Sequence, residues 1–183
     1  MIKYFAFAII SLALIVISRR SLREPGSHGF YRFFTWEFLA ALFLLNVGFW
    51  FRSPLAWFQL VSWTLLILSL IPLAEGVRML VSRGKAAAER PGEAHLLGFE
   101  KTTALVTDGI YRHIRHPLYS SLLLLGWGMF FKSPGVIGGL FALAATIFLV
   151  ATARADEKEC IRYFGPAYRE YMNRTKMFIP LLF

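Results

Sequence analysis

The chain has 183 residues, of which 57% are hydrophobic and only 17% are charged, and its mean hydropathy is +0.55. A soluble domain carries about 25% charged and about 45–50% apolar residues. The apolar excess comes in unbroken runs that a small soluble core could not bury, so the sequence predicts a protein solvated by lipid. The net charge of +9 does not indicate nucleic-acid binding, because Lys and Arg flank these runs as juxtamembrane charges do.

Five hydrophobic runs predict an all-α integral membrane protein of about five transmembrane helices. In chain order the runs cover residues 2–18, 33–51, 55–81, 118–131 and 136–153. The first run could be a cleaved signal peptide, but Arg19 and Arg20 follow it without a small-residue cleavage site, which favours an uncleaved span. The third run is long enough to cross about 30 Å of hydrocarbon.

The last two runs are predicted to form a tight helical hairpin over residues 118–153. The fourth run is short for a full span, and the Lys132-Ser-Pro-Gly135 sequence that follows it suits a turn. Small residues let two helices approach closely, and four glycines are expected to do so between these two helices: Gly126, Gly128, Gly135 and Gly139.

The orientation follows from the distribution of Lys and Arg over the loops. With five spans, Lys3, Arg52 and Lys132 fall on one side of the membrane, and every other Lys and Arg of the chain falls on the opposite side. Cytoplasmic loops carry the excess of positive charge. The expected topology therefore places the N-terminus outside and the C-terminus in the cytoplasm.

Two cytoplasmic segments are large enough to form a site, namely residues 82–116 and the tail 154–183. The chain is accordingly divided into three N-terminal spans, residues 1–81, and a region 82–183 that carries the candidate site. In the tail, apolar residues recur at helical spacing and are interrupted by Gly165-Pro166. This pattern predicts two short amphipathic helices that lie at the membrane interface.

The densest group of candidate functional residues is 107–119, a loop that becomes a helix at Pro117. Proline suits the first turn of a helix, and the unpaired N–H groups of that turn can bind an anion. Arg115 and His116 add donors there, and Tyr111 and Tyr119 offer aromatic faces and hydroxyls. The alternative is that the basic residues of this loop merely contact lipid phosphates.

A second candidate is the acidic group Asp156, Glu157 and Glu159, directly after the last span. Acids at a membrane edge that is otherwise basic suit a cationic ligand; the alternative is an ion pair with Arg115 or Arg154. An anion seat and acids at one membrane face would together fit a zwitterionic cofactor with a positive centre. No metal site is expected, because Cys160 is the sole cysteine and the four histidines form no HExxH pattern.

The ordered set of motifs resembles the isoprenylcysteine carboxyl methyltransferase and phospholipid methyltransferase family. It consists of Gly109-x-Tyr-x-x-x-Arg-His-Pro-x-Tyr119, a helical hairpin, an acidic pair, Phe164-Gly-x-x-Tyr-x-x-Tyr171 and finally Pro180. The resemblance covers about residues 100–180. It implies a membrane enzyme that transfers a methyl group from S-adenosylmethionine to a membrane-embedded acceptor, with a cytoplasmic cofactor pocket.

The resemblance also implies roles for individual residues. The cofactor would be held by the backbone of Thr103, Ala104, Leu105 and Val106, by Tyr111, by the turn His116, Pro117, Leu118 and Tyr119, and by Asp156 or Glu157. Arg115, His116 and Glu157 would be the catalytic residues. An amine acceptor must lose a proton, so Glu157 or His116 would act as the base.

The acceptor is expected to be lipid-soluble and to enter from the bilayer, as a phospholipid amine or a prenylcysteine carboxylate. Prenylcysteine enzymes carry an arginine about four residues before the cofactor-binding acid, whereas Arg154 here is offset by two residues. Two residues correspond to about 200° on a helix, which disfavours the carboxylate. The remaining alternatives are a nicotinamide-dependent membrane reductase of the sterol-reductase type and a non-enzymatic membrane scaffold.

Overall fold

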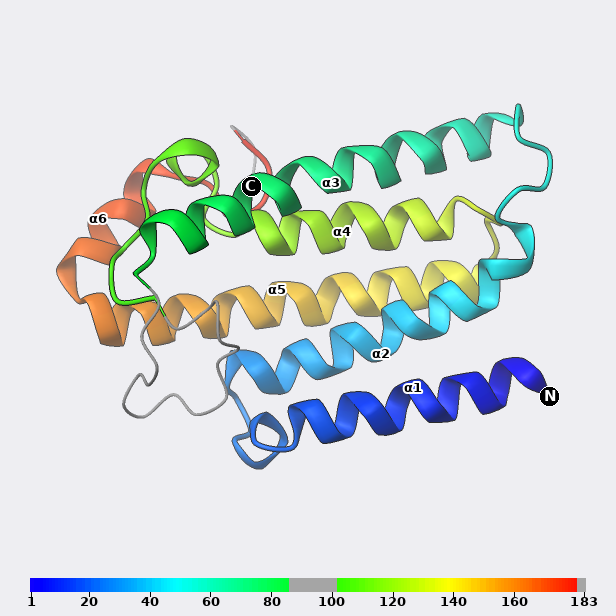
Figure 1. Cartoon of the computed structure of the whole chain (residues 1–183), viewed down its shortest axis with the longest axis horizontal. Coiled ribbons are helices and arrows are strands. Elements are labelled where there is room, and N and C mark those ends of the chain that lie inside the picture. Colours follow the sequence, from blue (N-terminus) through cyan, green and yellow to red (C-terminus); the bar gives the residue numbers. More distant parts are fainter. Residues whose placement is uncertain (86–101, 181–183) are drawn as a thin grey trace.

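The structure is a computed structural model and describes residues 1–85 and 102–180. Five long helices run alongside one another and alternate in direction (Figure 1). They are α1 (Ile2–Ser18), α2 (His28–Asn46), α3 (Trp57–Arg83), α4 (Pro117–Phe130) and α5 (Val136–Phe164). A short helix, α6 (Pro166–Arg174), lies beyond the end of α5 at one end of the bundle.

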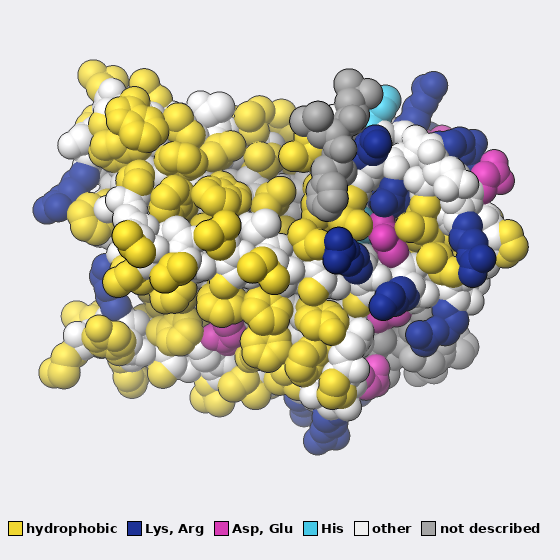
Figure 2. Space-filling model, turned by 180° about the vertical axis from the view of Figure 1, so that it is seen from behind, with side chains coloured by type: hydrophobic (Ala, Val, Ile, Leu, Met, Phe, Trp, Pro, Cys, Tyr) yellow, Lys and Arg dark blue, Asp and Glu magenta, His cyan; other side chains and the backbone are white. Residues whose placement is uncertain are grey.

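Helices α2, α3 and α5 are long and apolar enough to cross a membrane, whereas α1 and α4 are apolar but shorter. Large hydrophobic side chains cover much of the outer surface, and most of the charged side chains gather at the end that carries α6 (Figure 2). The prediction of an all-α integral membrane protein is confirmed. That all five helices span the bilayer, and that the charged end is cytoplasmic, stay predictions.

The core lies where α2, α4 and α5 meet and contains Leu39, Leu42, Met129, Ala142 and Ala145. The closest helix pairs are α2 with α5 and α3 with α4. Helices α4 and α5 do form the predicted antiparallel hairpin, and a Cβ on Gly139 would lie 3.6 Å from Phe130 of α4, but the partner assigned to Gly126 and Gly128 is wrong. A Cβ on Gly126 would lie 2.9 Å from Leu39 of α2, and one on Gly128 would lie 2.9 Å from Leu66 of α3.

Two helix boundaries differ from the prediction. Helix α2 begins at His28 rather than at residue 33, because the Ser27 hydroxyl caps it by accepting the Phe30 N–H at 3.1 Å. Helix α5 continues through Phe164, so the expected separate interfacial helix after residue 153 is wrong: no Pro or Gly interrupts this stretch. Gly165, with φ +62°, then turns the chain into α6.

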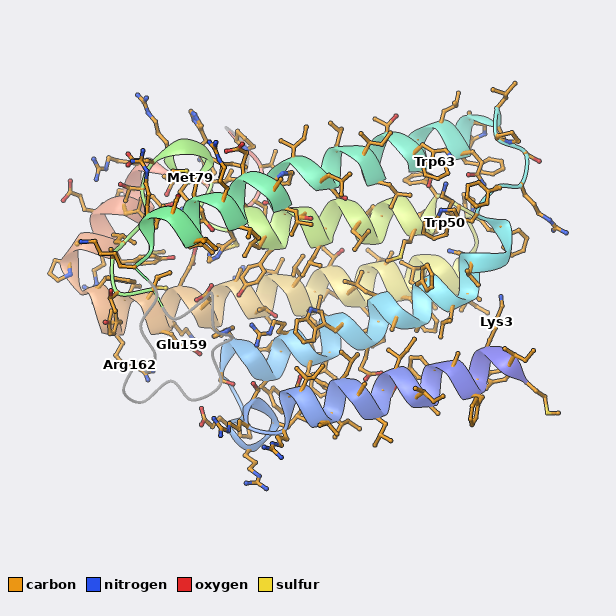
Figure 3. The ribbon with its side chains drawn as sticks, viewed as in Figure 1. Lys3, Trp50, Trp63, Met79, Glu159 and Arg162 are labelled. Atoms are coloured by element: carbon orange, nitrogen blue, oxygen red, sulfur yellow. The ribbon has the colours of Figure 1, made fainter. Side chains whose placement is uncertain are left out.

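The end of the bundle away from α6 contains a buried lysine. Lys132, in the turn between α4 and α5, is 1% exposed. Its ammonium donates to Gln59 Oε1 at 3.1 Å and lies 3.5 Å from the ring centroid of Trp63 and 5.2 Å from that of Trp50. Figure 3 shows both tryptophans at this end of the molecule. Cation–π contacts and the amide oxygen thus replace water around Lys132.

Candidate active site

A cavity opens at the charged end, where α2, α3, α4, α5, α6 and the segment 102–111 converge. Its empty space is about 750 Å³, a volume that includes open solvent at the mouth. Nine of the predicted site residues line it: Leu105, Val106, Tyr111, Arg115, His116, Pro117, Leu118, Tyr119 and Asp156.

The approach to α4 is held in place by the tail of the chain. The Arg115 N–H donates to the Lys176 carbonyl at 2.8 Å, and the His116 N–H donates to the Met177 carbonyl at 3.2 Å. In return the Lys176 N–H donates to the His113 carbonyl at 3.1 Å. Residues 113–116 and 176–177 therefore form a short parallel pairing that fixes the backbone of the Arg-His-Pro turn.

Arg115 and Glu157 form a buried ion pair. Nε of Arg115 lies 2.7 Å from Oε1 of Glu157, and the two side chains are 10% and 8% exposed. The guanidinium also donates to the carbonyls of Met172 and Thr175, so it joins α5 to the end of α6. Glu157 does not line the cavity. Of the two interpretations of the acids, the ion pair with Arg115 is therefore the one that the structure shows for Glu157.

His116 lies between the two adjacent acids at the start of α4. Nδ1 is 3.5 Å from Asp156 Oδ2 and Nε2 is 3.4 Å from Glu157 Oε1. Its ring stacks on Tyr119, whose hydroxyl donates to Asp156 at 3.2 Å. Burial by itself would lower the pKa of His116, but the hydrogen bonds and negative charges of the two acids raise it above its ordinary value. Asp156 is thus oriented by two side chains of the His-Pro turn.

Three further tyrosines line the cavity and form what we call the tyrosine wall. Tyr111, Tyr168 and Tyr171 are buried, and the Tyr171 hydroxyl donates to the Tyr111 carbonyl at 2.7 Å. Burial raises the pKa of Tyr168 and of Tyr171, so both hydroxyls stay protonated at neutral pH. Tyr168 and Phe164 stack with an interplanar angle of 19°. The wall can therefore bind a flat or cationic group without adding a charge of its own.

Fewer residues of the segment before Tyr111 line the cavity than predicted. The N–H groups of Thr103 and Ala104 donate to the Gly84 carbonyl at 3.0 and 3.1 Å, where α3 ends. Neither residue lines the cavity, whereas Leu105 and Val106 do. The middle of the predicted loop 82–116 lies outside the described residues.

Several lining residues were not among the predicted site residues. They are His28, Leu80, Thr102, Cys160, Phe164, Tyr168 and Tyr171. Tyr168 and Tyr171 could have been predicted from the sequence, because their helical spacing places them on one face of α6. No sequence pattern identified His28, since its partner Glu159 is 131 positions away.

The model of the family described as "Protein of unknown function (DUF1295)" matches residues 5–175. The chain belongs to this family. It is also 36% identical over 79 residues to "Methanethiol S-methyltransferase 2" of Bradyrhizobium diazoefficiens, a match that covers 42% of this chain and 29% of that protein. The family resemblance drawn from the ordered motifs is confirmed.

Two further relatives widen the range of names. The chain is 30% identical over 83 residues to "Protein-S-isoprenylcysteine O-methyltransferase" of Schizosaccharomyces pombe, which covers 45% of this chain and 35% of that protein. It is 39% identical over 84 residues to "Cobalt-zinc-cadmium resistance protein CzcN" of Cupriavidus metallidurans, which covers 45% and 38%. These three matches span 29%, 35% and 38% of the relatives' own lengths.

Proposed function

We propose that the cavity binds S-adenosylmethionine and that the protein transfers its methyl group to a membrane-soluble acceptor. The observation that carries this proposal is Asp156, the acid among the described residues that line the cavity. Its carboxylate is oriented by His116 and Tyr119 and suits the ammonium of the cofactor. The nearby aromatic rings suit the sulfonium, because aromatic faces attract cations, and they suit the adenine, because aromatic rings stack.

The residues present also fit the anionic part of the cofactor. Pro117 begins α4, and the N–H groups of the first helical turn lack partners within the helix. Because Leu118 and Tyr119 line the cavity, a carboxylate bound there could accept hydrogen bonds from this turn. Between Asp156 and Glu157, we therefore assign the cofactor contact to Asp156, and Glu157 to the ion pair that holds Arg115.

The charges around the cavity favour an acceptor without a carboxylate. The guanidinium of Arg115 is already used by Glu157 and by two carbonyls, and Arg154 is exposed. Neither arginine is placed to hold a carboxylate next to the methyl donor. We propose a neutral nucleophile that carries a proton, either a thiol or an amine, which dissolves in the bilayer and reaches the cavity from the membrane. The names of the relatives include a thiol methyltransferase.

Bound S-adenosylmethionine supplies an electrophilic methyl group for in-line displacement. The protein residues would position the reactants: Asp156 would hold the amino end of the cofactor, and the tyrosine wall and Leu118 would exclude water. Such positioning contributes most of the rate when the nucleophile is reactive. A neutral thiol or amine must in addition lose its proton during or before the transfer.

The test is the binding of S-adenosylmethionine to the full chain in detergent, measured by calorimetry. Asp156→Asn removes the charge that faces the ammonium and is expected to weaken binding at least tenfold, as the loss of a charge-assisted hydrogen bond of about 1.5–3 kcal/mol implies. Glu170→Gln, an exposed acid on α6, is the matched control and leaves the affinity unchanged. No binding by the wild type, or equal binding by Asp156→Asn, contradicts the assignment.

The acceptor is identified separately. Lipids, amines and thiols are incubated with the protein and a labelled methyl donor, and the products are analysed by mass spectrometry. A labelled thioether or amine is expected. A labelled carboxyl ester would overturn the assignment of the acceptor class while leaving the cofactor assignment intact. The relatives do not favour a nicotinamide-dependent reductase or a scaffold without activity.

A further inference from the structure

The first turn of α2 brings a second histidine to the cavity. His28 is 1% exposed and lines the cavity together with Asp156 and Cys160 of α5. Its ring belongs to the N-terminal part of the chain, which the resemblance did not cover. A nitrogen of the ring and an Asp156 oxygen lie within 4.8 Å of each other, so His28 is adjacent to the proposed position of the cofactor.

Glu159 fixes the orientation of His28 with both carboxylate oxygens. Oε1 accepts the backbone N–H of His28 at 2.9 Å, and Oε2 lies 2.6 Å from Nδ1. Figure 3 shows Glu159 on α5 at the level where α2 begins, whereas Arg162 of the same helix points away from the bundle. Because a carboxylate accepts, Nδ1 carries the proton, so in the neutral ring Nε2 holds the lone pair. A histidine held in this way by a carboxylate has the arrangement of a general base.

The surrounding charges suit a base: Arg32 favours a lone pair at Nε2, and the carboxylates stabilise the imidazolium that forms when the ring accepts a proton. Arg32, one turn further along α2, has a guanidinium nitrogen 3.5 Å from Nε2, a contact that suits a lone pair and not a second N–H. From α5, Asp156, Glu159 and Cys160 face the same region. His116 reaches it from the start of α4 through Asp156.

A metal ion is the competing interpretation, because His28, Asp156 and Glu159 offer ligand atoms within 4.8 Å of one another. The distance of 2.6 Å between His28 Nδ1 and Glu159 Oε2 argues against it. Two ligands of one zinc ion, each at about 2.0–2.2 Å with an angle of 90° or more, lie about 3 Å apart or further. The short separation is that of a hydrogen bond from Nδ1–H to the carboxylate.

We propose that His28 is the base that accepts the proton of the acceptor, and that Glu159 is its positioning residue. This inference rests on the proposed methyl transfer to a thiol or an amine. As the acceptor's S–H or N–H bond breaks, its proton passes to Nε2 of His28. The electron pair left on the acceptor forms the new bond to the methyl carbon, and the bond between that carbon and the cofactor sulfur breaks with its electrons moving to sulfur. The imidazolium, stabilised by Glu159, later releases the proton to water.

The key variant is His28→Asn, tested in the full chain in detergent. The asparagine amide can replace Nδ1 as the donor to Glu159, but it has no counterpart of Nε2. With ethanethiol as the acceptor at neutral pH, kcat is expected to fall about 100-fold or more. The KM for S-adenosylmethionine and the calorimetric affinity for it should stay unchanged. His113→Asn is the matched control, because His113 is exposed at the same end, and it should behave as the wild type.

Varying the acidity of the acceptor thiol distinguishes a His28 that acts as a base from a His28 that only stabilises the structure. The loss caused by His28→Asn should be much smaller with thiophenol, a more acidic thiol that needs less help in losing its proton. The rate of the variant with ethanethiol should also rise with pH in proportion to free thiolate. Equal losses with both thiols, or an unchanged kcat, overturn the proposal. If the wild type binds no S-adenosylmethionine, the proposed function itself has failed.

A second readout does not depend on turnover. Diethyl pyrocarbonate modifies neutral imidazole nitrogens, so in the wild type it should modify His28, and S-adenosylhomocysteine should slow the reaction, as followed by peptide mass spectrometry. An unreactive His28 overturns the proposal. So does activity that a chelator abolishes and zinc restores, since that result would identify the three residues as metal ligands.

Discussion

The two ends of the bundle bury charged groups in different ways. At one end, Lys132 is enclosed by Trp50, Trp63 and Gln59. At the other end, buried charges neutralise one another in pairs around a cavity, as Arg115 and Glu157 do. A cation packed against aromatic rings leaves no room for a ligand. Paired charges next to a cavity can instead form new ion pairs with a bound ligand. The comparison indicates that burial of an ionisable group marks a functional site only where a cavity accompanies it.

Breaking the ion pair should have the largest effect on stability. Arg115→Ala leaves the buried Glu157 with His116 as its remaining partner at 3.4 Å, and loss of the ion pair is expected to lower the free energy of unfolding by about 3 kcal/mol. Chemical denaturation in detergent measures this change. Arg154→Ala, an exposed arginine on α5, is the control and should change stability by less than about 0.5 kcal/mol. Equal effects of the two substitutions would show that the Arg115 pair contributes no more than a surface charge.

At the opposite end, Lys132→Met should have an intermediate effect. The substitution removes the cation–π contacts and leaves Gln59 Oε1 without the donor Lys132, which costs about 2 kcal/mol of unfolding free energy. The affinity for S-adenosylmethionine should stay unchanged, because Lys132 lies at the end away from the cavity. Denaturation and calorimetry on the same preparation test both statements. A lower affinity at unchanged stability would contradict the separation of the two ends.

The smallest effect concerns pH. The pKa of His116 is raised by Asp156 and Glu157, so its protonated form stabilises the folded state. This contribution is fully present below the ordinary value of 6.5 and is lost as the pH rises through the raised folded value. The unfolding free energy of the wild type minus that of His116→Gln should therefore be constant at mildly acid pH and decrease above it. A difference that grows with pH would contradict the assignment.

The sequence predicted the parts of the molecule that depend on neighbouring residues. The five apolar helices, the hairpin and the His-Pro turn at the start of α4 follow from local patterns of hydrophobicity and from Pro117. Helix α2 could have been extended to His28 by reading Ser27 as its cap. The continuation of α5 beyond residue 153 was missed because its acidic and basic residues were interpreted as a change of environment.

Long-range pairings could not be predicted in the same way. Gly126 and Gly128 approach α2 and α3 instead of α5, and spacing within one helix does not say which neighbour it faces. The division between Asp156 and Glu157 depends on a rotation of about 100° per residue. Only the position of Arg115 in space decides which of the two acids it pairs with.

The course of α5 has a consequence for how this region can change in evolution. Asp156, Glu157 and Glu159 stand on one uninterrupted helix and contact residues of other segments: His116 for Asp156, Arg115 and His116 for Glu157, and His28 for Glu159. Inserting or deleting a single residue upstream on the helix would rotate all three by about 100° and shift them by about 1.5 Å. Every partnership would be lost together. Point substitutions along α5 can accumulate one at a time, but insertions and deletions before Glu159 are not expected to be tolerated.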